Sequence, residues 1–405
     1  MKILVVTQRY DPDPFLINEI APEMVRWGHE VTVLTGLPSE AEKREKYRLF
    51  RNRREKINGV DVIRCYEAKR RDSAFGLALN YMSFALIASL KSLFLSRKFD
   101  CVFCYQLSPV TQILPAAVYR KVAGKKLLTY CLDIFPESVL SHTSQNSIVY
   151  KIVAWMTQKL YACSDRICVT SQTFVNYIHE VNQVSLEKLY YLPQHASDDM
   201  LNMNLEAADN GVADFMFAGN IGYAQVLETV VAAAERLASI RSDFFIHIVG
   251  DGARREELEK MVYEKGLESY FRFYGQRSRK EMPSLYTKAD ALLLTLRGNT
   301  RVGDTLPGKL QTYMTTGKPV IAAINGSAQS VIDEAKCGIC VPAENAEALS
   351  DAMLDFIQCP QKYCACGKNG RQYFRKHFTF DLFMTDLQKQ LEQTIGRKGA
   401  QDGNN

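Results

Sequence analysis

Short apolar runs alternate with helical patterns from the first residues of the chain onward. The pattern predicts strands at residues 2–6, 31–35, 60–65, 101–105, 126–131 and 167–170, with helices between them. Strands that alternate with helices in this way are typical of a parallel sheet covered by helices on both faces. The first half of the chain therefore predicts a doubly wound α/β domain.

The pattern breaks at a polar segment from Pro193 to Gly211, where we place a linker. A second series of predicted strands follows at residues 215–218, 244–249, 271–275, 291–294, 319–323 and 338–341. A chain of 405 residues is longer than one core usually supports. We expect two Rossmann-like doubly wound domains facing a cleft, residues 1–195 and 196–375, a helix at 376–399 packing back on the first domain, and a frayed tail at 400–405.

Composition and cysteine spacing narrow the class of protein. The eleven cysteines show no metal-ligand spacing, and several lie in apolar strand-like runs, so we expect reduced core residues and no metal site. The chain starts directly with a strand, from which we expect no signal peptide and a cytoplasmic protein. Nothing in the pattern predicts nucleic-acid binding.

Charge is uneven along the chain. Residues 1–195 contain 26 Lys and Arg against 18 Asp and Glu, and most of the excess lies in residues 43–56 and 69–71. A long apolar segment follows, and we expect it to form a helix at 75–97 that is too often interrupted by polar residues to span a membrane. The basic loop 43–56 and this helix suit an anionic membrane surface or a diphosphate-bearing lipid. A solvated basic face is the alternative.

The segment at Pro307, Gly308 and Lys309 predicts an anion-binding helix start. Pro307 suits the first helical position, the free amides there favour an anion, and Lys309 adds a full charge. Gly317 predicts the end of this helix, before a strand at 319–323. An ordinary capped helix is the alternative.

Glycine-rich loops follow two other strands of the second domain. Gly219 and Gly222 precede a helix predicted at 225–237, and Gly250 lies in the next strand–helix loop. Each loop alone is as compatible with a tight turn. Together with Lys309 they would lie at one sheet edge, which predicts a diphosphate site.

The chain resembles the GT-B glycosyltransferases of family 4, in particular the branch acting in bacterial surface and capsular polysaccharide assembly. In the first half the resemblance rests on residues 10–15 (Tyr-Asp-Pro-Asp-Pro-Phe), 18–20, 28–33, 105–109 and 132–138. In the second half it rests on residues 218–225 (Ala-Gly-Asn-Ile-Gly-Tyr-Ala-Gln), 295–297, 305–309, 313–314 and 317–320. The matches occur in order along nearly the whole chain.

This resemblance implies retaining transfer of a sugar, such as an N-acetylhexosamine or a deoxy-amino sugar, from a UDP-sugar to a polyprenyl-diphosphate-linked saccharide, without an obligatory metal or other cofactor. The enzyme must neutralise the leaving diphosphate, for which Lys309 and Arg297 are the candidates. The candidate donor-binding residues are Gly219, Asn220, Ile221, Gly222, Gln225, Gly250, Asp304, Leu306, Pro307, Gly308 and Thr312.

Two departures from the family pattern change the expected site. Many members have a Glu-x7-Glu pattern whose second Glu holds the donor ribose, and here Asp304 and Thr312 occupy these positions. Many also have an Arg and a Lys after the first glycine loop, where this chain has Asn220 and Gln225. Both departures place more of the diphosphate charge on Lys309 and Arg297.

In the first domain, Asp133 follows a predicted strand and is the candidate for positioning or deprotonating the acceptor hydroxyl. An N-cap of the helix entered at Pro136 is the alternative. Asp13, Asn18, Glu19 and Ser108 are the candidate acceptor-binding residues. We assign no catalytic role to His29 or His195.

Other functions remain open. A UDP-sugar epimerase of the same fold would need no acceptor, and a non-catalytic nucleotide-sugar-binding subunit would fit the altered residues at 304 and 312. A dinucleotide-dependent oxidoreductase is disfavoured because no G-x-G-x-x-G follows the first strand. On the resemblance we expect the transferase, peripheral on the inner face of the plasma membrane.

Overall fold

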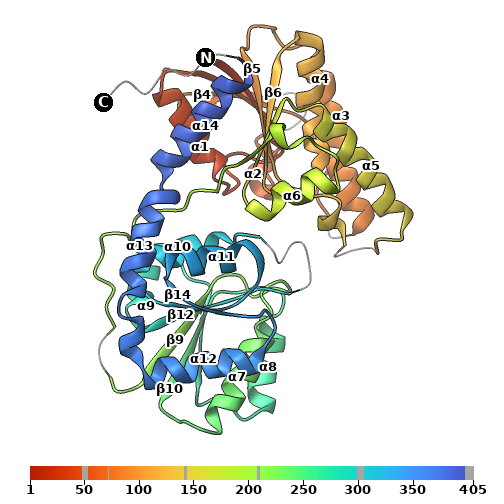
Figure 1. Ribbon diagram of the computed structural model, residues 1–405. Helices are drawn as coiled ribbons and strands as arrows, with labels where there is room; N and C mark the ends of the chain where they lie inside the picture. Colours follow the sequence, from red (N-terminus) through yellow and green to blue (C-terminus); the bar gives the residue numbers. More distant parts are fainter. Residues whose placement is uncertain (48–52, 72, 141–143, 208–209, 299–304, 397–405) are drawn as a thin grey trace, which may run out of the picture. The chain divides into compact units, whose positions relative to one another are not determined.

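A computed structural model describes residues 1–47, 53–71, 73–140, 144–207, 210–298 and 305–396 (Figure 1). The chain divides into two compact units. Unit 1 comprises Met1–Leu192 together with the C-terminal segment from Met384, and unit 2 comprises Pro193–Phe383.

Unit 1 contains an eight-stranded sheet in the order β3-β4-β2-β1-β5-β6-β7-β8, parallel except that β3 pairs antiparallel with β4. Its strands are β1 (Lys2–Val6), β2 (Glu30–Thr35), β3 (Arg54–Ile57), β4 (Val60–Arg64), β5 (Cys101–Gln106), β6 (Lys126–Cys131), β7 (Arg166–Val169) and β8 (Leu189–Tyr191). Its helices are α1 (Ile17–Arg26), α2 (Ala41–Glu45), α3 (Ala74–Leu93), α4 (Ile113–Ala123), α5 (Ile148–Ala162) and α6 (Gln172–Glu180), with 3₁₀ turns η1 (Val110–Gln112), η2 (Glu137–Val139) and η3 (Leu186–Lys188).

Unit 2 contains a six-stranded parallel sheet in the order β11-β10-β9-β12-β13-β14. Its strands are β9 (Ala213–Ala218), β10 (Phe244–Val249), β11 (Phe271–Gly275), β12 (Ala291–Thr295), β13 (Val320–Ala323) and β14 (Gly338–Val341). Its helices are α7 (Glu228–Ala238), α8 (Arg255–Glu264), α9 (Met282–Tyr286), α10 (Gly308–Thr316), α11 (Gly326–Ala335), α12 (Ala346–Gln358) and α13 (Cys366–His377), with the 3₁₀ turn η4 (Pro360–Tyr363). The expected pair of doubly wound Rossmann-like sheets is confirmed.

The polar segment that we interpreted as a linker is packed into unit 2. Met200, Leu201 and Leu205 are buried in its core, and the ring of His195 lies 4.6 Å from that of Phe380. The final helix, α14 (Phe380–Thr394), continues from unit 2 into unit 1. There Gln388 lies 2.8 Å from a ring nitrogen of His29, which gives this histidine a structural partner.

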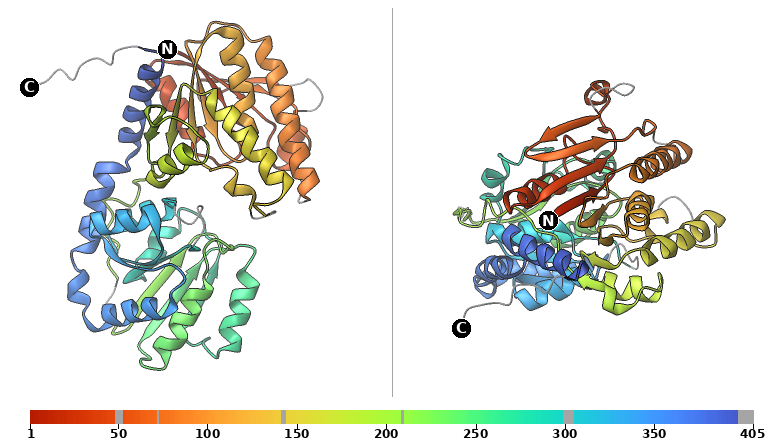
Figure 2. Two further views of the ribbon diagram at one scale, coloured as in Figure 1. Left: turned by 45° about the vertical axis from the view of Figure 1, so that its right-hand side comes forward. Right: turned by 90° about the horizontal axis from the view of Figure 1, so that it is seen from above.

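Helices α3, α4 and α5 cover the same face of the sheet of unit 1 (Figures 1 and 2). Helix α3 packs along α4 and leaves many of its apolar side chains exposed. By length and composition its segment Phe75–Leu93 could cross a membrane, although a third of that window is buried. The expectation that its polar residues make this tract unsuitable for a span was therefore wrong. A single apolar helix of this kind is weak evidence for a span, because helices in a protein core can be equally long and apolar.

Candidate active site

Two glycine loops of unit 2 touch each other at the carboxyl ends of β9 and β10. The amide of Gly219 donates to the carbonyl of Val249, and the carbonyl oxygen of Gly219 faces Gly250. A Cβ at Gly250 would lie only 1.9 Å from that oxygen, and both glycines have φ values, +137° and +146°, that favour glycine. The contact confirms that the two predicted loops share one sheet edge.

Helix α10 brings Lys309 to the same edge. The helix begins at Gly308, with Pro307 as an extended N-cap, so Pro307 lies one position earlier than the sequence predicted. A Cβ at Gly219 would lie 2.6 Å from Cε of Lys309 and 2.9 Å from its Nζ. Gly219 is therefore needed to leave room for the lysine.

The ammonium group of Lys309 is buried, and no described residue serves as its counterion. Its Nζ has no hydrogen-bond partner among the described residues, and it lies 3.4 Å from the centroid of the Phe217 ring. Burial lowers the pKa of Lys309 from 10.5 to about 7. A bound anion would reverse this effect, because it would compensate the lost hydration of the ammonium.

An open pocket of about 580 Å³ adjoins the glycine loops of unit 2. Three of the candidate donor-binding residues, Gly219, Asn220 and Gly250, line it. The remaining lining residues include Gln276, Arg277, Met282 and Tyr286, which the sequence reasoning did not single out. The sequence could have indicated two of them, because Gln276 and Arg277 directly follow β11, which pairs in parallel with β10.

The loop after β9 is held by bonds within the protein. The amide of Ile221 donates to the carbonyl of Asp251, and the amide of Gly222 donates to Oε1 of Gln225 at 3.2 Å. Since the amide of Gly219 is also bonded, three of the four backbone amides from Gly219 to Gly222 already have protein acceptors. Ile221 is itself buried in the core, so it supports the loop rather than the pocket.

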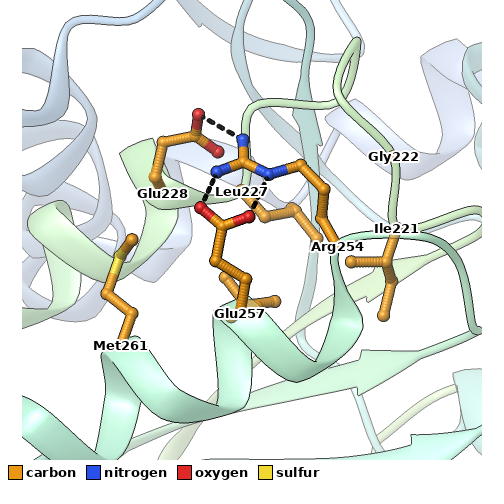
Figure 3. A pocket seen from close by; sticks show the side chains of 8 residues that line it. Ile221, Gly222, Leu227, Glu228, Arg254, Glu257 and Met261 are labelled. Atoms are coloured by element: carbon orange, nitrogen blue, oxygen red, sulfur yellow. Dashed lines mark hydrogen bonds and ion pairs between the residues drawn. The ribbon is translucent and has the colours of Figure 1, made fainter.

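Arg297 contacts the end of this loop, beside a cluster of ion pairs. Its guanidinium contacts the carbonyl of Tyr223 at 3.3 Å and lies 3.8 Å from a carboxylate oxygen of Glu228. Figure 3 shows the guanidinium of Arg254 between Glu228 and Glu257, with contacts of 2.7 Å and 2.9 Å. These hydrogen bonds raise the pKa of the Arg254 guanidinium, and the bond to Glu257 has the largest effect.

The cavity beside Arg254 has a volume of only about 10 Å³. A space of this size holds a water molecule at most. It is therefore too small for a sugar, and the larger pocket next to Gly219 is the candidate for the donor.

The other predicted donor residues lie around α10. Thr312 donates its hydroxyl hydrogen to the carbonyl of Gly308 within the helix, at 3.2 Å, and Leu306 packs against the core of unit 2. The neighbouring Gln311 donates to the carbonyl of Gln194. Asp304 lies outside the described residues, so of the two Glu-x7-Glu positions only the second, Thr312, can be located.

In unit 1, Asp133 follows β6 and lies beside Ser108. Burial raises the pKa of the Asp133 carboxyl, and the backbone N–H of Ser108 partly offsets this rise. The carbonyl of Asp133 accepts from Nε2 of Gln106 at 2.9 Å, which fixes the loop. Turn η2 begins after Pro136 and has no side-chain cap, so Asp133 does not act as the N-cap considered above.

Asp13 lies in the loop before α1 and contacts Asn18, which lies in the first turn of that helix. The carboxylate of Asp13 accepts the hydroxyl of Ser39 at 2.6 Å and its amide at 3.1 Å, so this aspartate ties two loops together. Nδ2 of Asn18 donates to the carbonyl of Asp13 at 2.7 Å, whereas its buried Oδ1 has no partner in the described part of the chain.

Glu19 is exposed in the first turn of α1. Burial is the main cause that raises the pKa of the Tyr105 hydroxyl. The negative charges of both Asp133 and Glu19 raise this pKa further, so both carboxylates lie near Tyr105. Glu19 and Asp133 therefore approach the same edge of the sheet in unit 1. Within the described residues, no group of three or more His, Cys, Asp or Glu is placed to hold a metal ion.

Two family models match the two halves of the chain. Residues 16–194 match the glycosyl transferase 4-like domain, and residues 202–373 match glycosyl transferases group 1. Among curated relatives, WcaI of Escherichia coli, named for colanic acid biosynthesis glycosyl transfer, is 26% identical over 96% of this chain and 100% of its own length. WbjE of Pseudomonas aeruginosa, named as a glycosyltransferase, is 23% identical over 77% of this chain and 78% of its own length.

Solved structures show the same fold. Anabaena HepE in complex with UDP superposes with a TM-score of 0.72 and 15% identity, covering 97% of this chain and all of that chain. The lipopolysaccharide outer core galactosyltransferase WaaB superposes with a TM-score of 0.67 and 15% identity over 97% of this chain and 99% of that chain. With both halves matched by family models and both sheets in place, the chain belongs to the GT-B glycosyltransferases of family 4.

Proposed function

We propose that this glycosyltransferase moves a sugar, with retention, from a UDP-sugar to a polyprenyl-diphosphate-linked saccharide during assembly of a surface polysaccharide. The transferred sugar is an N-acetylhexosamine or a deoxy-amino sugar. The enzyme works in the cytoplasm, peripherally on the inner face of the plasma membrane, without an obligatory metal ion.

The buried ammonium of Lys309, which has no hydrogen-bond partner among the described residues, is the observation that carries this proposal. A leaving diphosphate needs a positive charge that is fixed in place before the reaction. Lys309 lies at the start of α10 and against Gly219, next to the pocket of about 580 Å³. Its charge is not compensated by any described residue, so a diphosphate would be its counterion.

Arg297 has a different part in the proposed donor site. Its contacts with Glu228 and with the carbonyl of Tyr223 hold the loop that follows β9. We propose that it adds positive charge near the diphosphate and shapes this loop, whereas Lys309 makes the direct contact. In this proposal the donor contacts Asn220, Gly250, Pro307 and the first residues of α10 up to Thr312.

The relatives support the class of donor and the class of product. The neighbouring structure of HepE is a complex with UDP, and the same protein is also known with UDP-glucose. WcaI is named for colanic acid biosynthesis and WaaB for the lipopolysaccharide outer core. These names favour a UDP-sugar donor and a surface polysaccharide as the product of the pathway.

Asp133 is the proposed group that positions or deprotonates the acceptor hydroxyl. A general base must lie at the reacting centre and have a pKa near the working pH. Burial raises the pKa of Asp133 toward that range, and the carboxyl is not used to cap η2. Ser108, Glu19 and Asn18 line the same part of unit 1 and would contact the acceptor.

Membrane attachment is proposed from α3 and its basic flank. Phe75, Leu79 and Leu86 are 79%, 50% and 53% exposed, and Lys69, Arg70 and Arg71 are exposed just before the helix. An apolar helix face beside positive charge suits an anionic lipid surface. Part of the basic loop 43–56 lies outside the described residues and joins this proposal on its charge alone.

A donor screen with purified protein tests the proposal. We expect UDP-sugars to raise the melting temperature more than GDP- or TDP-sugars. The shift should be measurable, because a ligand at 100 times its Kd stabilises a protein by about 2.7 kcal/mol. The selected donor should release UDP only when a lipid-diphosphate saccharide is present, and the release should persist in EDTA. An epimer formed without acceptor, or binding without any transfer, would instead favour the epimerase or the non-catalytic subunit.

A further inference from the structure

We propose that the exposed face of α5 is a second membrane-binding surface of unit 1, which inserts Trp155 into the headgroup region of an anionic bilayer. The inference rests on the membrane association proposed above, and it adds an element that the basic loop and α3 do not include. It also sets which side of unit 1 faces the lipid.

Helix α5 exposes a stripe of large apolar side chains. Ile148, Ile152 and Trp155 are 70%, 55% and 62% exposed, and Val149 beside them is 52% exposed. Positions separated by three or four residues share one face of a helix. The opposite face contains Thr157, Leu160 and Tyr161, which are buried against the sheet. The helix therefore carries apolar side chains on its solvent face as well as on its core face.

The charges around this stripe favour an anionic lipid surface over a protein partner. Neither α5 nor α3 contains an Asp or a Glu, whereas Lys151 and Lys159 are exposed on α5. Lysines can extend toward lipid phosphates while the apolar side chains between them enter the acyl boundary. Tryptophan is the residue type most suited to that boundary, because its ring is apolar and its indole N–H remains hydrated.

The position of α5 places its stripe on the same side as that of α3. Both helices pack against η1 at the start of α4, and both cover one face of the sheet (Figures 1 and 2). Two exposed apolar helices on one side of a unit can contact a flat surface together. A bilayer is such a surface, and the cations Lys69, Arg70 and Arg71 lie at the start of α3 to meet its charge.

Intrinsic fluorescence gives a direct test, because the chain contains only two tryptophans. In a Trp27→Phe variant, Trp155 is the only tryptophan, so the tryptophan emission reports on this residue alone. We expect its emission to shift to the blue on vesicles of phosphatidylcholine with phosphatidylglycerol, and to be quenched by brominated acyl chains. Vesicles of phosphatidylcholine alone should give a much smaller effect at equal lipid concentration.

Each other outcome has a defined meaning. If the protein sediments with anionic vesicles while Trp155 emission stays unchanged, α3 and the basic loop bind lipid and the role of α5 is wrong. If the protein does not sediment with the vesicles at all, the proposed membrane association itself is wrong. A blue shift that develops without lipid, as the protein concentration rises, would assign the stripe to a second copy of the chain.

A double variant provides a matched comparison. In Val149→Ser with Ile152→Ser, we expect half-maximal vesicle binding to need about tenfold more lipid, because two exposed apolar side chains no longer enter the bilayer. Leu186→Ser is the control, since Leu186 is 52% exposed in unit 1 but lies in η3. Circular dichroism and activity toward a water-soluble acceptor should be unchanged in both. Equal lipid binding by the double variant would overturn the proposal.

Discussion

The ammonium of Lys309 lies 3.4 Å from the centroid of the Phe217 ring. The face of an aromatic ring attracts a cation, but it does not neutralise the charge as a carboxylate would. Phe217 belongs to β9 and lies two residues before Gly219, so one strand supplies both the ring and the space for the lysine. The lysine is thereby held in place while its charge stays available to a ligand.

Removing this charge should reduce turnover strongly. We expect Lys309→Ala to lower kcat with the selected UDP-sugar by about a hundredfold, the scale for losing one preorganised electrostatic contact. Lys280→Ala, which removes an exposed lysine of unit 2, should have a normal rate. A near-normal rate in Lys309→Ala would show that the diphosphate binds elsewhere.

The same lysine should make the stability of the ligand-free protein depend on pH. Its pKa is about 7 in the folded state against 10.5 ordinarily, so between these values the unfolded state binds more protons. The free energy of unfolding should therefore rise with pH from about 7 toward 10, and this rise should be smaller in Lys309→Met. Urea unfolding at pH 7 and pH 9.5 measures it. Identical slopes in the two proteins would contradict a lowered pKa.

Gly219→Ala should impair donor binding. Its Cβ would lie 2.6 Å from Cε of Lys309, at a φ value of +146° that side chains rarely adopt. We expect a large rise in the KM for the donor, with a weaker thermal shift on adding UDP. Gly266→Ala is the control, because Gly266 also has a positive φ, +66°, but no atom lies within 4 Å of the added carbon. Equal donor binding in both variants would refute the steric role of Gly219.

Asp133 and Glu137 should respond differently to loss of charge. If Asp133 is the base, activity falls as the pH drops through its raised pKa, and Asp133→Asn should lower kcat and abolish this acidic limb. Glu137→Gln should mainly lower the melting temperature, because its buried carboxylate accepts from Tyr150 and Tyr177, each at 3.0 Å. A pH–rate profile for each variant separates the two roles. An unchanged acidic limb in Asp133→Asn would exclude it as the base.

Neutralising the basic flank should release the protein from anionic vesicles. We expect binding at low salt to be lost when Arg51, Arg53, Arg54, Arg70 and Arg71 are replaced by Gln, and wild-type binding to weaken as salt rises. Lys280→Gln with Lys376→Gln, which removes two exposed charges of unit 2, is the control. Equal sedimentation of the five-residue variant would show that these charges do not mediate attachment.

Apolar periodicity was sufficient to predict the central strands of both sheets and the edge strands of unit 2, but not β3 and β8 at the edges of unit 1. Strand β3 contains Arg54, Glu55 and Lys56, which belong to the basic run, and it is stabilised by antiparallel pairing with β4 rather than by burial. Strand β8 has only three half-buried residues, too few for a pattern. Helix α7 begins at Glu228 rather than at Gln225, because the preceding Val226 adopts a left-handed φ of +47°.

In the candidate site, too, some residues could be predicted from the sequence and others could not. Lys309 could be placed from local chemistry, since a helix start and a glycine loop are recognisable within a few residues. The surroundings of Arg297 could not, because its partner Glu228 lies 69 positions earlier and only the folded sheet brings them together. The pocket residues Met282 and Tyr286 belong to α9, a short helix without a sequence signal of its own.

The close contact between Gly219 and Gly250 limits how donor preference can change in this enzyme. Any side chain at Gly250 would push against the carbonyl of Gly219, which in turn leaves room for Lys309. Variation there would disturb every nucleotide sugar alike. Altered selectivity, by natural divergence or by directed evolution, should therefore arise at other residues that line the pocket, such as Gln276, Arg277 and Tyr286.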